Sequence, residues 1–302
     1  MAKNKLPKII IIVGPNASGK SDLGVQIAKK VGGEVISADS RQVYHGMDIG
    51  TGKITKKEMA GIPHHLLSIA SPKKDFNVSY FKKLAERKIK EIIVRGHVPV
   101  IVGGTGFWID ALVYDFNLPE VGPDRKLRAK LERQSVEKLF SRLKKLDPER
   151  ADSIDRKNKR RLVRALEIVL LSKKPVPRLE KTPKYETLFI GVKKDKKELE
   201  DRIYKRLLKR LDRGMIGEVK KLRKSGVSWK RLDDFGLEYR FVSRYLRGQL
   251  AYDEMVAQLF SAIKKYAKRQ MTWFKRNKNI RWVRNPRQAI SFLRRGFFCR
   301  PE

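Results

Sequence analysis

The stretch KIIIIVGPNASGKSDLGVQIAKK, residues 8–30, places a glycine-rich loop between an apolar run and a helical pattern. Within the loop, Gly14, Gly19, Lys20 and Ser21 match every fixed position of G-x-x-x-x-G-K-[ST]. The apolar run predicts a buried strand, and apolar residues recur at helical spacing after the loop. This strand–loop–helix context predicts a phosphate-binding loop, or P-loop, rather than a glycine-rich turn that binds nothing.

A P-loop binds anionic oxygens through its backbone, because its glycines let successive N–H groups point inward at the start of a helix. Lys20 adds a mobile positive charge, and the Ser21 hydroxyl can coordinate Mg²⁺. The motif is shared by ATP-binding and other nucleotide-binding proteins, so it predicts a diphosphate or polyphosphate ligand and leaves the reaction open. The predicted binding residues are Gly14, Pro15, Asn16, Ala17, Ser18, Gly19, Lys20 and Ser21.

Residues 1–116 alternate strand and helix patterns on both sides of this loop. Apolar runs predict strands over 34–37 and 98–102, and an amphipathic pattern predicts a helix over 81–92. Such alternation is typical of an α/β fold, here a P-loop NTPase-like parallel sheet with helices on both faces.

Two further segments follow strand ends, as the P-loop does. Asp39 follows one predicted strand, and Gly103-Gly104-Thr105 follows another. Because the carboxyl ends of parallel strands meet at one edge of the sheet, we expect all three segments to line one crevice. A carboxylate there can act as a general base or bind Mg²⁺, although capping a turn is an equally common role for aspartate after a strand.

Residues 117–185 carry helical patterns with long basic faces and predict an all-helical insertion. One helix is expected over 158–172, where Arg160, Arg161 and Arg164 share a face. These arginines could be solvated surface, but in a strongly basic protein we favour contact with a nucleic-acid backbone.

The remaining chain returns to the core with a strand over 187–192 and then becomes mostly helical. One helix is expected to begin near Asp195, with Glu198 completing a capping box, and a last long helix is expected over 252–276. The core domain is therefore predicted to comprise 1–116 and 186–302.

The charge balance is extreme, with 71 Lys and Arg against 33 Asp and Glu and a net charge of +38. Self-repulsion at this charge favours a polyanionic partner, and nucleic acid is the first candidate. A lysine-rich surface bias is the alternative, but such biases usually raise glutamate together with lysine.

The single cysteine, Cys299, allows no disulfide within the chain, which fits a reducing cytoplasm. His64 and His65 lack the neighbouring ligands of a zinc site, so packing or a substrate contact is favoured for them. No apolar stretch is long enough to span a membrane.

Taken together, these segments resemble the tRNA dimethylallyltransferases, also called tRNA isopentenyltransferases, over nearly the whole chain. The most specific pieces are GPNASGKS, ISADSRQVYHGMDIGTGK, PHHLLSIASP, PVIVGGTGFW, RRLVRALEI and AYDEMVAQLFSAIKKYAKRQMTWFK. Members of this family transfer a dimethylallyl group from dimethylallyl diphosphate to N6 of the adenine 3′-adjacent to the anticodon, in tRNAs reading codons that start with U. The chain has no zinc finger after these segments, which favours the bacterial type, and we expect a cytoplasmic monomer.

The resemblance implies a role for each matched residue. Asp39 would be the catalytic base, Lys20 and the amides of 16–21 would stabilise the leaving diphosphate, Ser21 would hold Mg²⁺, and Thr105 would act beside them. The residues implied in binding the anticodon stem-loop of tRNA are Asp39, Ser40, Arg41, Gln42, Thr105, Arg128, Arg160, Arg161, Leu162, Val163 and Arg164.

Three other functions would each explain part of the sequence pattern. A P-loop kinase would turn over ATP but would not need the charge of +38 or the basic insertion. An RNA-binding protein with a relict P-loop would explain the charge but not the placement of Asp39 and Lys20. An enzyme that prenylates free adenine nucleotides would not need the 117–185 insertion.

The segment Gly236-Leu237-Glu238-Tyr239 matches the family pattern loosely.

Overall fold

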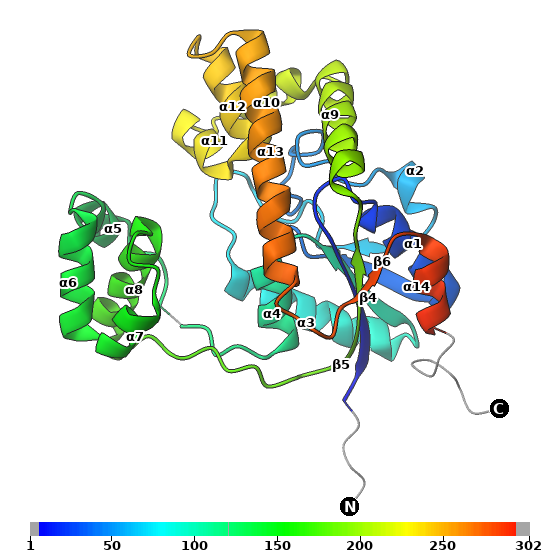
Figure 1. Ribbon diagram of the computed structural model, residues 1–302, viewed down its shortest axis with the longest axis horizontal. Coiled ribbons are helices and arrows are strands. Elements are labelled where there is room, and N and C mark those ends of the chain that lie inside the picture. The colour runs from blue at the N-terminus through cyan, green and yellow to red at the C-terminus, as the bar shows by residue number, and fades with distance from the viewer. Residues whose placement is uncertain (1–5, 120, 294–302) are drawn as a thin grey trace, which may run out of the picture. The chain divides into compact units, whose positions relative to one another are not determined.

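The computed structural model describes residues 6–119 and 121–293 (Figure 1). The chain forms two compact units. A core unit comprises Met1–Tyr114 and Pro183–Glu302, and an inserted unit comprises Asp115–Thr182. Each unit has its own hydrophobic core.

A fully parallel sheet forms the centre of the core unit, as the alternating sequence pattern predicts. Its six strands have the order β3-β2-β4-β1-β5-β6, so β1 with the P-loop lies inside the sheet. The strands are β1 (Lys8–Val13), β2 (Gly33–Ser37), β3 (His64–His65), β4 (Val98–Gly103), β5 (Glu186–Val192) and β6 (Arg281–Val283). The sequence predicted β1, β2, β4 and β5, whereas β3 and β6 are too short to leave a periodic signal.

Helices cover both faces of this sheet, which explains why β1 is apolar throughout. Ile10 and Ile12 pack with α1 (Lys20–Val31) and α14 (Pro286–Phe292), while Ile9 and Ile11 face the opposite side. On that opposite side lie α3 (Val78–Val94) and α4 (Gly106–Val113). Burial on both faces removes the polar alternation that a half-exposed strand would show.

Further helices of the core unit follow β5 and pack on one another. Their apolar side chains belong to the same hydrophobic cluster as Ile9 and Ile11. The longest of them, α13 (Tyr252–Phe274), contacts α4, α9 and α12 (Figure 1). The other helices after β5 are α9 (Lys196–Asp212), α10 (Met215–Lys224), α11 (Trp229–Phe235) and α12 (Leu237–Leu246), whereas the short α2 (Lys56–Met59) lies earlier in the chain, between β2 and β3.

The predicted capping box at the start of α9 does not form. Asp195 occupies the N-cap position, but its side chain makes no capping hydrogen bond. Glu198 instead pairs with Lys194 at 2.9 Å and Arg202 at 3.7 Å. The sequence therefore predicted the helix start correctly. The capping box is absent because the Glu198 carboxylate pairs with Lys194 and Arg202 instead.

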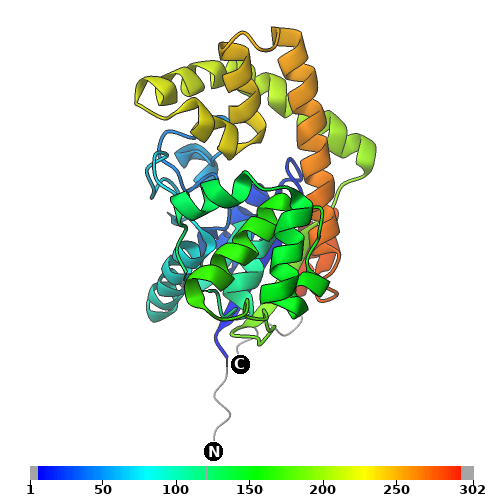
Figure 2. The same cartoon turned by 90° about the vertical axis from the view of Figure 1, so that its left-hand side faces the viewer.

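The inserted unit is a helical bundle, and Figure 2 shows its green helices packed against one another. Leucines from each longer helix, including Leu131, Leu139, Leu143 and Leu162, form its core. The helices are α5 (Arg125–Glu132), α6 (Val136–Leu146), α7 (Pro148–Ser153) and α8 (Lys159–Ser172).

A buried carboxylate ties three segments together at the start of β2. Glu34 accepts hydrogen bonds from Arg95 at 2.8 and 3.0 Å, from His65 at 2.6 Å and from His97 at 2.7 Å. Burial raises the pKa of Glu34, but the hydrogen bonds from Arg95, His97 and His65 outweigh it and lower the pKa to about 2. His65 therefore has a structural role in the core unit, whereas the sequence had left packing and a substrate contact as alternatives to a zinc site.

Glu34→Gln is expected to lower the free energy of unfolding by about 1–3 kcal/mol, because it replaces charge-assisted hydrogen bonds with weaker ones. Since the folded-state pKa lies below its ordinary value of 4.5, this contribution is full above pH 4.5 and is lost as the pH falls towards about 2. Urea unfolding of both proteins across this range measures the effect, and the difference between them should shrink as the pH falls.

Glu91→Gln on α3 provides the matched control. Glu91 also pairs with basic side chains, Lys88 and Arg87, but the pair is at the surface. Such pairs contribute little, so this variant should unfold almost like the parent. Equal losses from Glu34→Gln and Glu91→Gln would contradict the role given to Glu34.

Candidate active site at the phosphate-binding loop

The predicted P-loop connects the end of β1 to the start of α1. Ala17 and Gly19 adopt left-handed backbone conformations, with φ of 64° and 92°, which fold the loop into a tight curve. A Cβ atom at Gly14 would lie 2.8 Å from the Val192 carbonyl oxygen, so only glycine fits against β5 there. Lys20 Nζ donates to the Pro15 carbonyl at 3.4 Å and thus lies over the loop.

The amides of this loop are not all available to a ligand. The Asn16 N–H donates to the Gln270 side chain at 2.9 Å, and the Ser18 N–H donates to the Pro15 carbonyl at 3.3 Å. The first N–H groups of α1 have no partner within the helix and point out of its start. The expectation that every amide of 16–21 faces the diphosphate therefore needs correction at Asn16 and Ser18.

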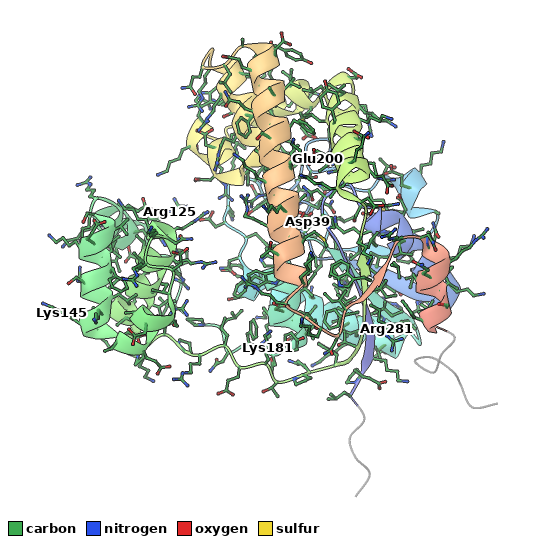
Figure 3. All side chains as sticks on the ribbon, viewed as in Figure 1. Asp39, Arg125, Lys145, Lys181, Glu200 and Arg281 are labelled. Atoms are coloured by element: carbon green, nitrogen blue, oxygen red, sulfur yellow. The ribbon has the colours of Figure 1, made fainter. Side chains whose placement is uncertain are left out.

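Asp39 lies just beyond β2, as predicted, and beside α13 (Figure 3). Its Oδ1 accepts hydrogen bonds from the Arg41 N–H at 2.9 Å and the Gln42 N–H at 3.4 Å. The turn-capping role considered from the sequence is therefore present. It does not remove the carboxylate from the crevice, because the same side chain interacts electrostatically with Lys20.

Thr105 lies next to this turn. Its Oγ1 accepts a hydrogen bond from the Ser40 N–H at 3.1 Å, and its own N–H donates to the Ala38 carbonyl at 3.3 Å. A Cβ at Gly103 would collide with the Ala38 carbonyl, so glycine is needed for the two strand ends to approach. The predicted convergence of the P-loop, the Asp39 turn and the Gly103–Thr105 segment is thus what the structure shows.

Cations crowd this crevice. Burial lowers the pKa of Lys20 to about 8, Asp39 opposes the change, and Arg206 and Arg210 add to it. Burial and the charge of Arg210 also lower the pKa of Arg206. Neighbouring positive charges therefore contribute to lowering the pKa values of both Lys20 and Arg206, and a bound anion would offset this repulsion.

Helix α9 brings these arginines to the P-loop. Arg202 Nε donates to the Ala17 carbonyl at 2.9 Å, and Arg206 lies one turn further along the helix. The sequence shows Arg202, Arg206 and Arg210 at four-residue spacing, but nothing in that spacing indicates which anion they face. Their assignment to the crevice needs the fold.

Helix α13 forms a further wall of the crevice. Tyr266, Gln270 and Trp273 share one face of it, and a Cβ at Gly106 would collide with Trp273. Trp273 Nε1 donates to Asp110 at 3.0 Å, which fixes α13 against α4. Burial, followed by the charge of Asp39, raises the pKa of Tyr266 to about 12. None of these three side chains is indicated as a site residue by the sequence pattern.

The segment after Asp39 uses its own side chains to bind backbone carbonyls elsewhere in the core unit. Arg41 Nε donates to the Phe235 carbonyl at 2.8 Å, and Gln42 Nε2 donates to the Gly52 carbonyl at 3.4 Å. Both residues were predicted to contact tRNA, and both contribute here to the shape of the loop.

Glu218 on α10 is the main anchor of this segment. Its carboxylate accepts hydrogen bonds from the N–H groups of Asp48, Ile49 and Gly50 at 2.8, 2.6 and 3.0 Å. The Tyr239 hydroxyl adds one at 2.8 Å. In the loosely matched 236–239 segment, Glu238 pairs with Arg210 at 2.9 Å, and Arg210 donates to the Gly50 carbonyl at 3.1 Å. Both Glu238 and Tyr239 therefore help to hold the loop, each through one intermediate side chain.

Glu218→Gln is expected to lower the free energy of unfolding by about 2 kcal/mol and to free the Asp48–Gly50 loop, because one oxygen that accepts N–H groups becomes a donor. Hydrogen exchange at residues 48–50 and urea unfolding measure the two effects. Tyr239→Phe removes a single hydrogen bond to the same carboxylate and should cost about 1 kcal/mol without freeing the loop. Equal exchange rates in the two variants would refute the anchoring role.

In the inserted unit, two of the predicted tRNA contacts hold a buried carboxylate. Glu167 is 0% exposed and accepts hydrogen bonds from Arg128 at 2.7 and 2.8 Å and from Arg164 at 2.5 Å. Although burial raises the pKa of Glu167, its bonds with Arg128 and Arg164 lower it overall. Arg164 also donates to the Val121 carbonyl at 2.8 Å.

The other predicted contacts on α8 divide by exposure. Arg160 and Arg161 are exposed, whereas Leu162 and Val163 are 0% and 4% exposed and belong to the core of the inserted unit. The side chains of Leu162 and Val163 are therefore not presented to a partner.

The described ranges contain no group of three or more His, Cys, Asp or Glu side chains placed to hold a metal ion. Ser21, in the first turn of α1 beside Lys20, remains the residue that suits Mg²⁺ together with oxygens of a bound diphosphate. Among the helices of 6–119 and 121–293, none combines the length and apolar character needed to cross a bilayer.

A curled loop at the carboxyl edge of a parallel sheet, with a carboxylate and clustered cations beside it, defines a P-loop protein that acts on a phosphorylated ligand. Residues 42–277 match the model of the IPP transferase family, and residues 7–71 match that of isopentenyl transferase. The chain belongs to the IPP transferase family, which includes the tRNA dimethylallyltransferases.

Relatives and solved structures agree with this assignment. A tRNA dimethylallyltransferase of Pelotomaculum thermopropionicum is 41% identical over 94% of this chain and 92% of its own. One of Staphylococcus carnosus is 40% identical over 97% and 96%. The crystal structure of the tRNA isopentenylpyrophosphate transferase of Bacillus halodurans has a TM-score of 0.71 at 38% identity, covering 95% of this chain and 94% of that one. A eukaryotic dimethylallyltransferase captured acting on tRNA has a TM-score of 0.84 at 26% identity, covering 98% and 80%.

Proposed function

We propose that this protein transfers the dimethylallyl group of dimethylallyl diphosphate to N6 of the adenine 3′-adjacent to the anticodon, in tRNAs reading codons that start with U. The observation that carries the proposal is the meeting of Asp39, Lys20 and Thr105 at one edge of the sheet. A kinase would use the P-loop cations and a neighbouring carboxylate equally well, but it would not need the net charge of +38 or the basic inserted unit.

The reaction breaks the allylic C1–O bond of the donor and forms a bond between C1 and the adenine N6. Negative charge grows on the departing diphosphate, where Lys20, Arg206 and the amides at the start of α1 stabilise it. The Ser21 hydroxyl would help to hold Mg²⁺, which would supply further positive charge for the departing diphosphate.

Asp39 receives the proton that N6 loses as the new bond forms. The N6 lone pair is delocalised into the ring, so the amine is a weak nucleophile and needs both a base and accurate placement. The Asp39 turn fixes the carboxylate through the Arg41 and Gln42 amides, and Thr105 holds the same turn through Ser40. The target base must leave the anticodon-loop stack to reach this crevice.

Exposed cations of the inserted unit are proposed to contact the tRNA backbone. Arg160 and Arg161 are free of the Glu167 cluster and exposed, so they suit phosphate contacts. Arg128 and Arg164 act by shaping the unit. A net charge of +38 strengthens association with tRNA and makes it dependent on salt.

Incubation with labelled dimethylallyl diphosphate, Mg²⁺ and bulk tRNA tests the proposal, with labelled ATP in a parallel reaction. Label on the adenine next to the anticodon, confined to tRNAs that read U-initial codons, with ATP intact, is the expected result. Consumption of ATP without labelled tRNA would favour a kinase instead. Light scattering of the purified protein tests whether it is a monomer.

A further inference from the structure

Gln270 connects the two loops that flank the reaction crevice. It lies on α13, is 5% exposed, and uses both ends of its side-chain amide. Its Oε1 accepts from the Asn16 N–H at 2.9 Å, and its Nε2 donates to the Gly104 carbonyl at 3.0 Å. These partners are 254 and 166 residues away in the sequence.

Each partner is adjacent to a group that the proposed reaction uses. Asn16 belongs to the loop that ends at Lys20, and Gly104 directly precedes Thr105. A Cβ built on Gly104 would collide with the Gln270 amide and would lie 3.7 Å from Lys20 Cε. The absence of a side chain at Gly104 therefore allows α13 to reach both loops close to Lys20.

The chemistry of the two contacts selects a primary amide. One loop presents an N–H and the other a carbonyl oxygen, so the bridging group must accept at one end and donate at the other. A carboxylate could only accept, and it would face the Gly104 oxygen. An aliphatic side chain would remove the partner of both backbone groups, one of them at a buried contact.

We propose that Gln270 is a positioning residue that fixes the spacing between the diphosphate-binding loop and the Thr105 segment, and thereby aligns the prenyl donor with the acceptor adenine. This inference rests on the proposed function for its reaction. Misplacement of reacting groups by about 1 Å can lower a rate about 10²-fold, so a bridge at this point has a large effect without touching substrate.

Gln270→Glu gives a reversible test. A protonated glutamic acid reproduces the glutamine pattern, since its O–H donates to Gly104 and its C=O accepts from Asn16, whereas the ionised form cannot donate. The charged or titratable groups around the bridge are Lys20 from α1, Asp39 after β2, Arg206 from α9, Tyr266 on α13 and Asp110 from α4. Expressing the variant's rate relative to the parent at each pH cancels the titration of these shared groups.

The expected result is a kcat for Gln270→Glu about 10²-fold below the parent near pH 8, with most of the loss recovered near pH 6, and a KM for dimethylallyl diphosphate that changes less than kcat. Gln270→Ala should lose a similar factor at both pH values. Gln258→Glu, an exposed position on the same helix, controls for added charge and should match the parent. Far-ultraviolet circular dichroism at each pH verifies folding.

A loss in Gln270→Glu that does not recover at low pH in a folded sample, or activity equal to the parent at pH 8, would overturn the inference. Calorimetric binding of inorganic diphosphate separates this failure from failure of the proposed function. If the parent transfers no prenyl group, Gln270→Ala should still bind inorganic diphosphate about tenfold more weakly than the parent, because its P-loop has lost the hydrogen bond to Asn16. Unchanged binding would by itself refute the positioning role of Gln270.

Discussion

Asp39→Asn is expected to lower the single-turnover rate of prenyl transfer about 10²–10⁴-fold and to leave the affinity for tRNA nearly unchanged. The asparagine side chain has the shape of aspartate and keeps an oxygen for the Arg41 and Gln42 amides, so the turn survives. What it loses is the capacity to take the proton from N6.

This substitution is sharper than Asp39→Ala for a structural reason. Alanine would also remove the acceptor that caps the turn, so a loss of activity could reflect a distorted Ser40–Gln42 segment. A folded Asp39→Asn protein that binds tRNA in a filter assay but does not transfer label isolates the base. Asp201→Asn, an exposed acid on α9, controls for the change in net charge and should keep full activity.

The competing functions predict different outcomes for the same protein. An RNA-binding protein with a relict P-loop has no rate to lose, and substitution of Asp39 would then affect only binding. Transfer at the parental rate by Asp39→Asn would show that another group accepts the proton. Tyr266, whose pKa is raised to about 12, would then be the neighbouring hydroxyl to substitute next.

The parts of this site that were predicted from the sequence are local ones. The P-loop needs only a strand, its glycines and a helix in succession, and the position of Asp39 follows from its place just after a strand. Both are encoded within one short continuous stretch of the chain, so periodicity and the motif suffice.

The parts that were not predicted depend on contacts between distant segments. Gln270 reaches Asn16 across 254 residues, and Glu218 reaches Ile49 across 169. Each is a single polar residue within the apolar stripe of an amphipathic helix, so the pattern indicates that the residue is buried but does not identify its partners. Gly104 and Gly106 are a weak sequence signal of this packing, because α13 can approach them closely only where no side chain intervenes. A glycine does not, however, indicate which segment approaches it.

The inserted unit illustrates a different limit of sequence reasoning. An arginine-rich face on a helix is read as a binding surface, yet Arg128 and Arg164 are used to neutralise Glu167. A signal was present, since Glu167 lies within the apolar stripe of α8 and a buried carboxylate requires partners. Arginines therefore indicate a nucleic-acid binding surface only when no buried carboxylate nearby requires them as partners.

Lys20→Met is expected to lower kcat for prenyl transfer about 10²–10³-fold, because it removes a cation aimed at the departing diphosphate. Lys20→Arg keeps the charge but changes its shape and reach, and it should retain more activity than Lys20→Met. Transfer by Lys20→Met at the parental rate would show that Arg206 and the P-loop amides suffice without the lysine. Steady-state kinetics with dimethylallyl diphosphate as the varied substrate provides the measurement.

The pH dependence of the parent gives an independent test of the same lysine. Burial lowers the pKa of Lys20 to about 8, so the free enzyme loses this proton above pH 8, and kcat/KM for the donor should fall about tenfold per pH unit there. Stability should change in the opposite direction. Between pH 8 and the ordinary lysine value of 10.5 the unfolded chain binds more protons than the folded one, so this group makes the protein more stable as the pH rises. A fall in kcat/KM that accompanies a constant or rising unfolding midpoint therefore indicates titration of Lys20, and both trends should disappear in Lys20→Met. If the fall persists in that variant, another group with a pKa near 8 controls donor binding.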